Sequence, residues 1–95
     1  MNNIRVMICE VGKKPYVKKI PNELEVMHEL VGGYIETAPL INDLIVVCNE
    51  EGILLNLPIN NNLGVHILGN FFVARTDGDE FVSITDEDIE ILNRM

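Results

Sequence analysis

Every second residue at the start of the chain is a large aliphatic one, which predicts a β-strand. Ile4, Val6 and Ile8 have this spacing, and a period of two places their side chains on one face of a strand. Gly12–Pro15 has the composition of a turn, and Tyr16–Ile20 that of a second strand. We therefore expect residues 1–20 to form a β-hairpin.

Residues 23–31 have the spacing of an amphipathic α-helix. Apolar side chains recur there at intervals of three and four, as they do along one stripe of a helix. Asn22 is the expected N-cap, with Glu25 as its capping-box partner. Gly32 is expected to end the helix, because a positive φ is easily adopted by glycine.

The middle of the chain predicts further strands. Tyr34–Ile41 has strand character but is interrupted at Pro39, which cannot donate a backbone hydrogen bond. Leu44–Cys48 is apolar throughout, the pattern of a central strand that is covered on both faces. After a turn at Asn49–Gly52, Ile53–Leu57 is expected to return as the strand that pairs with it.

The C-terminal part predicts a hairpin followed by a helix. Phe71–Arg75 and Phe81–Ile84 flank an Asp-Gly turn. Thr85 is the expected N-cap of a second helix at about 86–94, whose acidic first turn suits the helix dipole. Together these elements predict a single α+β domain over residues 1–95, a mainly antiparallel sheet with two short helices.

Composition indicates a folded protein of the cytoplasm. The chain is 47% hydrophobic and 23% charged, as globular domains are, and its first residues lack the apolar segment of a secretory signal. The longest apolar run, Leu44–Cys48, is far too short for a membrane span. Cys9 and Cys48 are expected to be buried, reduced thiols.

Charge is divided unevenly along the chain. Residues 1–20 hold five cations and one acid, a net charge of +4, whereas residues 21–95 hold two cations and fourteen acids, a net charge of −12; the total is −8. No binding of a nucleic-acid duplex is expected, because that affinity depends on cations that neutralise phosphates. A local group of cations can still hold a small anion.

The residue types that enzymes use are poorly placed. Ser83 is the only serine and lacks the glycines of a nucleophile elbow, and neither cysteine has a histidine close to it in sequence. Asp77–Glu80 lacks most ligands of a calcium loop, and Gly32-Gly33 follows a helix rather than opening one, unlike a phosphate loop. We therefore expect a protein that is not an enzyme and uses no metal or cofactor.

The remaining features suit a small nucleotide. Such a ligand needs cations for its phosphates, an aromatic ring for its base and amides for its polar edges. A glycine beside a ring lets a ligand or a second subunit approach the backbone. The candidate binding residues are Arg5, Lys13, Lys14, Lys18, Gly33, Tyr34, Asn49, Asn60, Asn61 and Phe72. The alternative role of the lysines is to protect an exposed sheet edge against pairing with other chains.

Five motifs resemble those of a family of small proteins carried by phages, plasmids and Gram-positive bacteria, catalogued as a domain of unknown function. The resemblance extends over nearly the whole chain and includes no catalytic set. The motifs are Glu29–Glu36, Val47–Gly52, Leu57–Asn60, Gly69–Val73 and Phe81–Thr85.

The resemblance implies an origin in a phage or another mobile element. Small phage proteins often counter bacterial immunity, and one strategy is an oligomeric sponge that holds a nucleotide signal without cleaving it. The leading hypothesis is therefore a homo-oligomer, a dimer or tetramer, that sequesters a small anionic nucleotide-type ligand in the host cytoplasm.

Three alternatives stay open. The acidic body, Asp77–Glu90 especially, suits a protein–protein inhibitor that imitates DNA or occupies a basic partner surface. A small hydrolase or transferase would use Cys48, His66 or Glu50. The third alternative is a structural accessory protein without a ligand.

Overall fold

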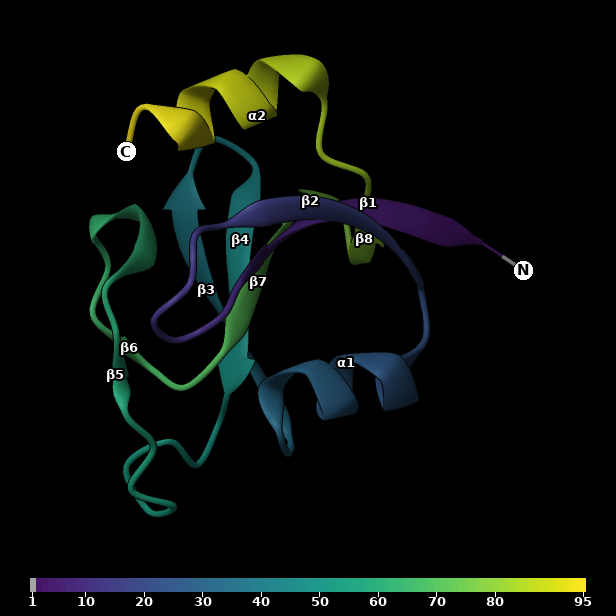
Figure 1. Ribbon diagram of the computed structural model, residues 1–95. Coiled ribbons are helices and arrows are strands. Elements are labelled where there is room, and N and C mark those ends of the chain that lie inside the picture. Colours follow the sequence, from purple (N-terminus) through teal and green to yellow (C-terminus); the bar gives the residue numbers. More distant parts are fainter. Residues whose placement is uncertain (1) are drawn as a thin grey trace.

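Strand β7 is the middle strand of the sheet, and the other elements are arranged around it (Figure 1). In the computed structural model, which describes residues 2–95, the main sheet has six strands in the order β2-β1-β7-β4-β3, with β8 paired to the C-terminal half of β7. All neighbouring strands run antiparallel. The elements in chain order are β1 (Asn3–Cys9), β2 (Tyr16–Pro21), α1 (Leu24–Val31), β3 (Ile35–Ile41), β4 (Leu44–Asn49), β5 (Ile59–Asn60), the 3₁₀ turn η1 (Asn62–Gly64), β6 (Ile67–Leu68), β7 (Phe71–Asp77), β8 (Glu80–Val82) and α2 (Asp86–Asn93). The predicted α+β fold with two helices is confirmed.

Two adjacent phenylalanines at the start of β7 face opposite sides of the sheet, because side chains alternate along a strand. Phe72 packs with Met27 of α1, and Phe71 packs with Leu92 of α2. We call these sides the α1 face and the α2 face; η1 and β6 also pack on the α2 face. Both faces of β7 are therefore buried, and the two helices lie apart in Figure 1.

The ends of the helices follow the sequence in part. Gly32 ends α1 with φ 82°, as predicted, and its N–H donates to the His28 carbonyl at 2.8 Å. The predicted capping box at the start of α1 is wrong: the N-cap is Glu23, and the Asn22 amide instead donates to the Phe81 carbonyl at 3.3 Å. Thr85 caps α2, as predicted.

The predicted strand at Ile53–Leu57 is wrong, and the reason is that both edges of β4 are already occupied. One edge pairs with β3 and the other with β7. The segment instead folds into successive turns, in which the Leu57 N–H donates to the Gly52 carbonyl at 3.0 Å and Asn56 adopts φ 54°. Its apolar side chains are therefore left at the surface.

The outer strands of the sheet carry features that resist further pairing. On β2 the exposed Lys18 and Lys19 line one edge of the sheet. On β3 the pairing register shifts between Pro39 and Ile41, which confirms the interruption predicted there. Each α-helix has eight residues, and among residues 2–95 no helix has the length and hydropathy needed to cross a membrane.

A buried ion pair attaches α2 to the sheet. Arg75 on β7 donates from Nε and Nη2 to the two oxygens of Asp88, at 2.9 Å each, and Asp88 is 2% exposed. Asp88 also accepts from the Thr85 N–H at 2.8 Å. The hydrogen bonds from Arg75 lower the pKa of the Asp88 carboxyl to about 2; burial opposes this change, and the bonds from Thr85 reinforce it.

We predict that this ion pair makes folding stability depend on pH in the acid range. Because the pKa of Asp88 in the folded protein lies below its ordinary value of 3.8, its stabilisation is complete above about pH 4 and is lost as the pH falls toward about 2. Asp88→Asn should lower the free energy of unfolding at neutral pH by about 2 kcal/mol and flatten that acid dependence. Urea titrations from neutral pH to acid pH measure both effects.

Asp43→Asn is the matched control for this prediction. Asp43 also contacts Arg75, at 3.3 Å, but its side chain is mostly exposed, so its loss should change stability by less than about 1 kcal/mol. Equal losses in the two variants would contradict the assignment of Asp88 as the anchor of α2.

Candidate functional site

The candidate cations of the hairpin do not all lie on one face of the sheet. Lys18 pairs with Val6 and Lys19 pairs with Arg5 across the β1–β2 ladder, so the two lysines lie on opposite faces. Lys13 and Lys14 lie in the turn before β2. Neither of the two hollows described below, within residues 2–95, is lined by lysine or arginine.

Arg5 has a structural role that sequence analysis missed. Its Nε and Nη2 donate to the Ile84 carbonyl at 3.1 Å and 2.9 Å, and its Nη1 lies 3.0 Å from Asp86 Oδ1. Arg5 therefore fixes the segment that leads into α2, and its guanidinium is already engaged by these contacts rather than directed at a shared phosphate site.

Two of the three predicted asparagines are buried and support the backbone. Asn60 Nδ2 donates to the carbonyls of Cys9 and Gly69 at 2.9 Å each, which ties β5 to β1. Asn49 Nδ2 donates to the Val31 carbonyl at 3.0 Å, which joins the end of β4 to the end of α1. Asn61 is exposed. Asn60 therefore supports the backbone, whereas Asn49 does so and also lines the larger hollow described below.

The aromatic residues and the glycine predicted to contact a ligand lie in different environments. Phe72 is 0% exposed and packs beneath α1, so its ring is not offered for base stacking. A Cβ at Gly33 would lie 3.0 Å from Asn49 Nδ2, so the absence of a side chain at Gly33 makes room for Asn49. Tyr34 is 64% exposed and meets the ring of His28 edge to face at 5.6 Å. Tyr34 thus remains accessible.

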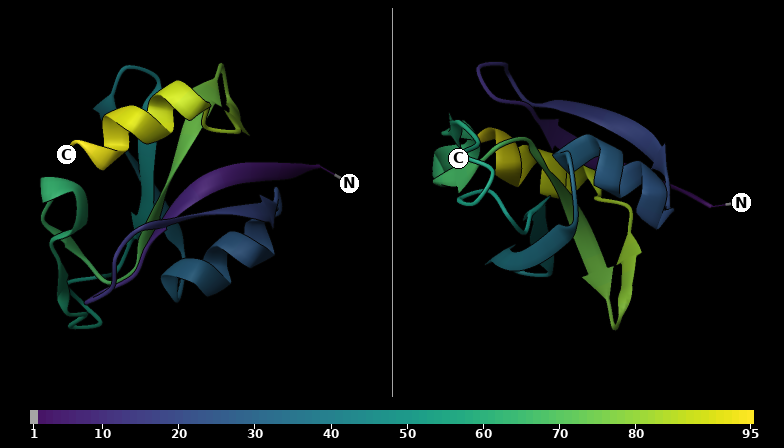
Figure 2. Two further views of the ribbon diagram at one scale, coloured as in Figure 1. Left: turned by 45° about the horizontal axis from the view of Figure 1, so that its top comes forward. Right: turned by 90° about the horizontal axis from the view of Figure 1, so that it is seen from below.

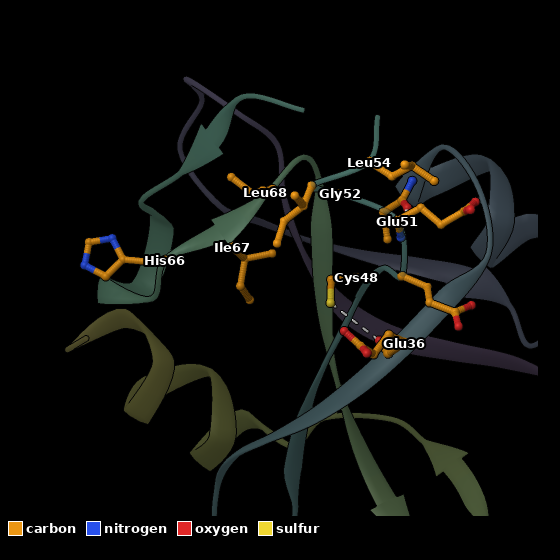
Figure 3. A pocket seen from close by; sticks show the side chains of 11 residues that line it. Glu36, Cys48, Glu51, Gly52, Leu54, His66, Ile67 and Leu68 are labelled. Atoms are coloured by element: carbon orange, nitrogen blue, oxygen red, sulfur yellow. Dashed lines mark hydrogen bonds between the residues drawn. The ribbon is translucent and has the colours of Figure 1, made fainter. Parts of the chain in front are cut away.

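The larger of the two hollows lies on the α2 face, between the β3–β4 pair and β6 (Figure 3). Its volume is about 700 Å³, within the range of ligand sites. Apolar side chains and acids line it together, including Glu36, Cys48, Glu50, Glu51, Leu54 and Ile67. The smaller hollow, of about 450 Å³, lies between the start of β1 and β8 and is mainly polar.

Local contacts hold the turn after β4 against this hollow. Asn49 Oδ1 accepts from the Glu51 N–H at 2.7 Å, which directs the chain out of β4. A Cβ at Gly52 would lie 3.0 Å from the Cβ of Leu68, so glycine lets the turn lie against β6. The sequence Asn49–Gly52 was correctly predicted as a turn, but its contact with β6 was not foreseen.

The turn presents aliphatic side chains to solvent beside acids. Ile53 is 86% exposed and Leu54 is 78% exposed, and Leu55 is also exposed. Gly52 alone separates them from Glu50 and Glu51 in the sequence. We call Glu36 and the segment Glu50–Leu55 the docking surface. Sequence analysis missed it because these aliphatic residues were assigned to a strand.

The residues of the hydrolase alternative line the same hollow. Cys48, Glu50 and His66 all line it, yet the His66 ring points away from the sulfur in Figure 3. The Cys48 thiol donates to the Glu36 carbonyl at 3.6 Å. Burial, together with the charge of Glu36, raises the pKa of Cys48, and burial raises the pKa of Cys9 to about 12. A raised pKa disfavours the thiolate that a nucleophile requires.

Metal ligands are not gathered either. Among residues 2–95, no three His, Cys, Asp or Glu side chains are grouped as a metal ion would require. The two cysteines are both buried and unbonded to each other.

Comparison with protein families gives one result. The family model described as Domain of unknown function (DUF3846) matches residues 4–95. The chain belongs to this family. The match includes both the β1–β2 hairpin and the docking surface. No curated protein and no solved structure shows significant similarity to the chain.

For this DUF3846 chain we predict that both thiols react slowly in the folded state. At about pH 8 the reaction of each with a chromogenic disulfide should be about a hundredfold or more slower than in denaturant, because burial and the raised pKa both suppress attack. Cys9→Ser isolates the rate of Cys48. Reaction of folded Cys48 at the rate of a free thiol would instead indicate an activated nucleophile.

Proposed function

We propose that the chain is a non-catalytic binding protein whose docking surface holds a basic, partly apolar segment of another protein. The observation that carries this proposal is that the exposed Ile53 and Leu54 line the same hollow as Glu50 and Glu51. The proposal keeps the acidic protein–protein inhibitor among the alternatives given by the sequence, but its surface is Glu50–Leu55 with Glu36 rather than Asp77–Glu90.

The apolar part of the surface supplies the binding energy. Burying one large aliphatic side chain contributes about 1.5–3 kcal/mol, and Ile53 and Leu54 are both almost fully available for it. Exposed aliphatic residues that are consecutive and lie beside a hollow are typical of an interaction site. Isolated exposed residues such as Leu24 need no such explanation.

The charge of the surface selects the partner. Glu36, Glu50 and Glu51 line the hollow, and residues 21–95 carry a net charge of −12. This field repels phosphates and attracts lysine and arginine, and it speeds the encounter with a basic partner. A partner segment with cations next to aliphatic residues therefore fits the docking surface.

The chemistry of the hollow supports binding without turnover. Its thiol is protonated by preference, since burial and Glu36 raise the pKa of Cys48. The partner is accordingly held and returned unchanged. An origin in a phage or another mobile element, as the resemblance of the motifs implies, makes a factor of the host cytoplasm the natural partner.

Capture of a nucleotide is the weaker proposal. It needs cations that converge, and Lys13, Lys14 and Lys18 lie outside both hollows. The exposed ring of Tyr34 is the observation that still favours it. The experiment below therefore includes nucleotides.

We predict that the protein binds a synthetic peptide of alternating lysine and leucine and does not bind a glutamate–leucine peptide of the same length. Ile53→Ser/Leu54→Ser should weaken the affinity about tenfold or more, because the two lost aliphatic contacts together cost at least about 1.4 kcal/mol. Fluorescence anisotropy with labelled peptides measures this. Both side chains are exposed, so the variant should keep the wild-type melting temperature.

Matched variants separate specific docking from general attraction to an acidic protein. Leu24→Ser removes an exposed aliphatic side chain at the start of α1 and should leave the affinity unchanged. Glu50→Gln/Glu51→Gln should weaken binding, whereas Asp77→Asn/Asp79→Asn, with the same charge change, should not. Equal binding of both peptides, or wild-type affinity in the Ile53/Leu54 variant, contradicts the proposal. If calorimetry shows binding of cyclic oligonucleotides or ADP-ribose, and the Ile53→Ser/Leu54→Ser variant binds them equally well, nucleotide capture is established instead.

A further inference from the structure

The cationic hairpin and the docking surface emerge at the same end of the sheet. Strands β1 and β4 both pair antiparallel with β7 and therefore run parallel to each other. Each ends beside the start of β7: Cys9 pairs with Phe71, and Val47 pairs with Phe72. The β1–β2 turn follows one strand and Glu50–Leu55 follows the other, so two surfaces of opposite charge share one end of the molecule.

The hairpin turn has the chemistry that the docking surface selects. Lys13 and Lys14 are exposed in the turn, and the exposed Val17 follows on β2. Val17 pairs with Met7, whose side chain lies on the α2 face, so Val17 faces the side that holds the hollow. The right-hand view of Figure 2 shows the purple β1–β2 turn projecting from the body of the molecule.

The hairpin cannot reach the docking surface of its own chain. Its strands are held in register by pairing from Asn3 with Pro21 to Ile8 with Tyr16. The Val11 N–H donates to Asn70 Oδ1 at 2.9 Å, which fixes the base of the turn. Strand β7 also lies between β1 and β4, and Lys13 Nζ lies 3.8 Å from Glu10 Oε2 of its own hairpin. A contact of the turn with Glu50 and Glu51 is therefore assigned to two copies.

We propose that two copies form a two-fold dimer in which the Lys13–Lys14 turn of each occupies the docking surface of the other. Each copy contributes cations and Val17, and receives them on Glu50, Glu51 and the aliphatic residues beside them. A two-fold axis repeats the contact, which doubles the buried area. Docking of one Glu50–Leu55 turn against its own copy would instead oppose like charges.

This dimer would regulate the proposed function, and its regulatory role therefore rests on that function. A dimer covers the docking surface, and a basic partner must displace the lysine turn to bind. The dimer itself requires no partner, so it is tested with the chain alone.

Sedimentation velocity over protein concentrations up to about 1 mM tests the dimer. We expect a reversible monomer–dimer equilibrium that weakens between low salt and about 0.5 M salt, where screening shortens the reach of charges. Lys13→Glu/Lys14→Glu should weaken it about tenfold or more, and so should Glu50→Lys/Glu51→Lys. Mixing these two variants should restore a dimer of one copy of each, because both of its contacts are again complementary.

Matched variants control for net charge. Lys18→Glu/Lys19→Glu changes the net charge by the same amount as the variant with both turn lysines reversed. Asp77→Lys/Asp79→Lys changes it by the same amount as the variant with Glu50 and Glu51 reversed. Both control variants should still dimerise. A monomeric wild type, or reversal variants that fail to recombine, overturns the dimer. If the dimer is overturned but the lysine–leucine peptide still binds, the proposed function stands. If a charge-dependent dimer forms but the peptide does not bind, only the proposed function is contradicted.

Discussion

The pairing of β7 with both β1 and β4 is the constraint on which the rest of the structure depends. It buries β7 on both edges and, through Phe71 and Phe72, on both faces. It also occupies the second edge of β4, which forces Ile53–Leu57 out of the sheet. Finally, it makes β1 and β4 parallel, so the segments that follow them meet at one end of the molecule.

The exposed aliphatic turn is thus a consequence of the topology. In the part of the chain that the structure describes, Ile53 and Leu54 are the most exposed of the large hydrophobic residues. The turn that presents them is held by Asn49 and by the close approach of Gly52 to Leu68. Ordered backbone contacts of this kind lower the entropy lost on binding, which suits a preformed docking surface.

Local patterns predicted the elements better than their partners. The first hairpin, the glycine end of α1 and the interruption at Pro39 each follow from neighbouring residues. The fate of Ile53–Leu57 depends on which strands flank β4, and that is a long-range property. A strand-like pattern records that side chains are apolar; it does not record whether an edge is available to pair with.

The candidate site was harder to predict, because its residue types have two uses. An asparagine side chain serves a ligand or the backbone equally well, and Asn60 serves the backbone from β5. Cations that are neighbours in the sequence of a strand point to opposite faces of the sheet, as Lys18 and Lys19 do. The uneven charge was nevertheless informative, since it divides the molecule into a basic turn and an acidic surface. Their nearness at one end of the sheet required the strand order.

Methyl NMR spectra of the isotope-labelled chain test the central claim most directly, which is that recognition takes place at Glu50–Leu55. The account predicts that the methyl resonances of Ile53, Leu54 and Leu55 shift when the lysine–leucine peptide is added, while those of Leu24 stay in place. Unchanged resonances at these three residues, with shifts confined to the surroundings of Tyr34 when a nucleotide is added, would contradict it.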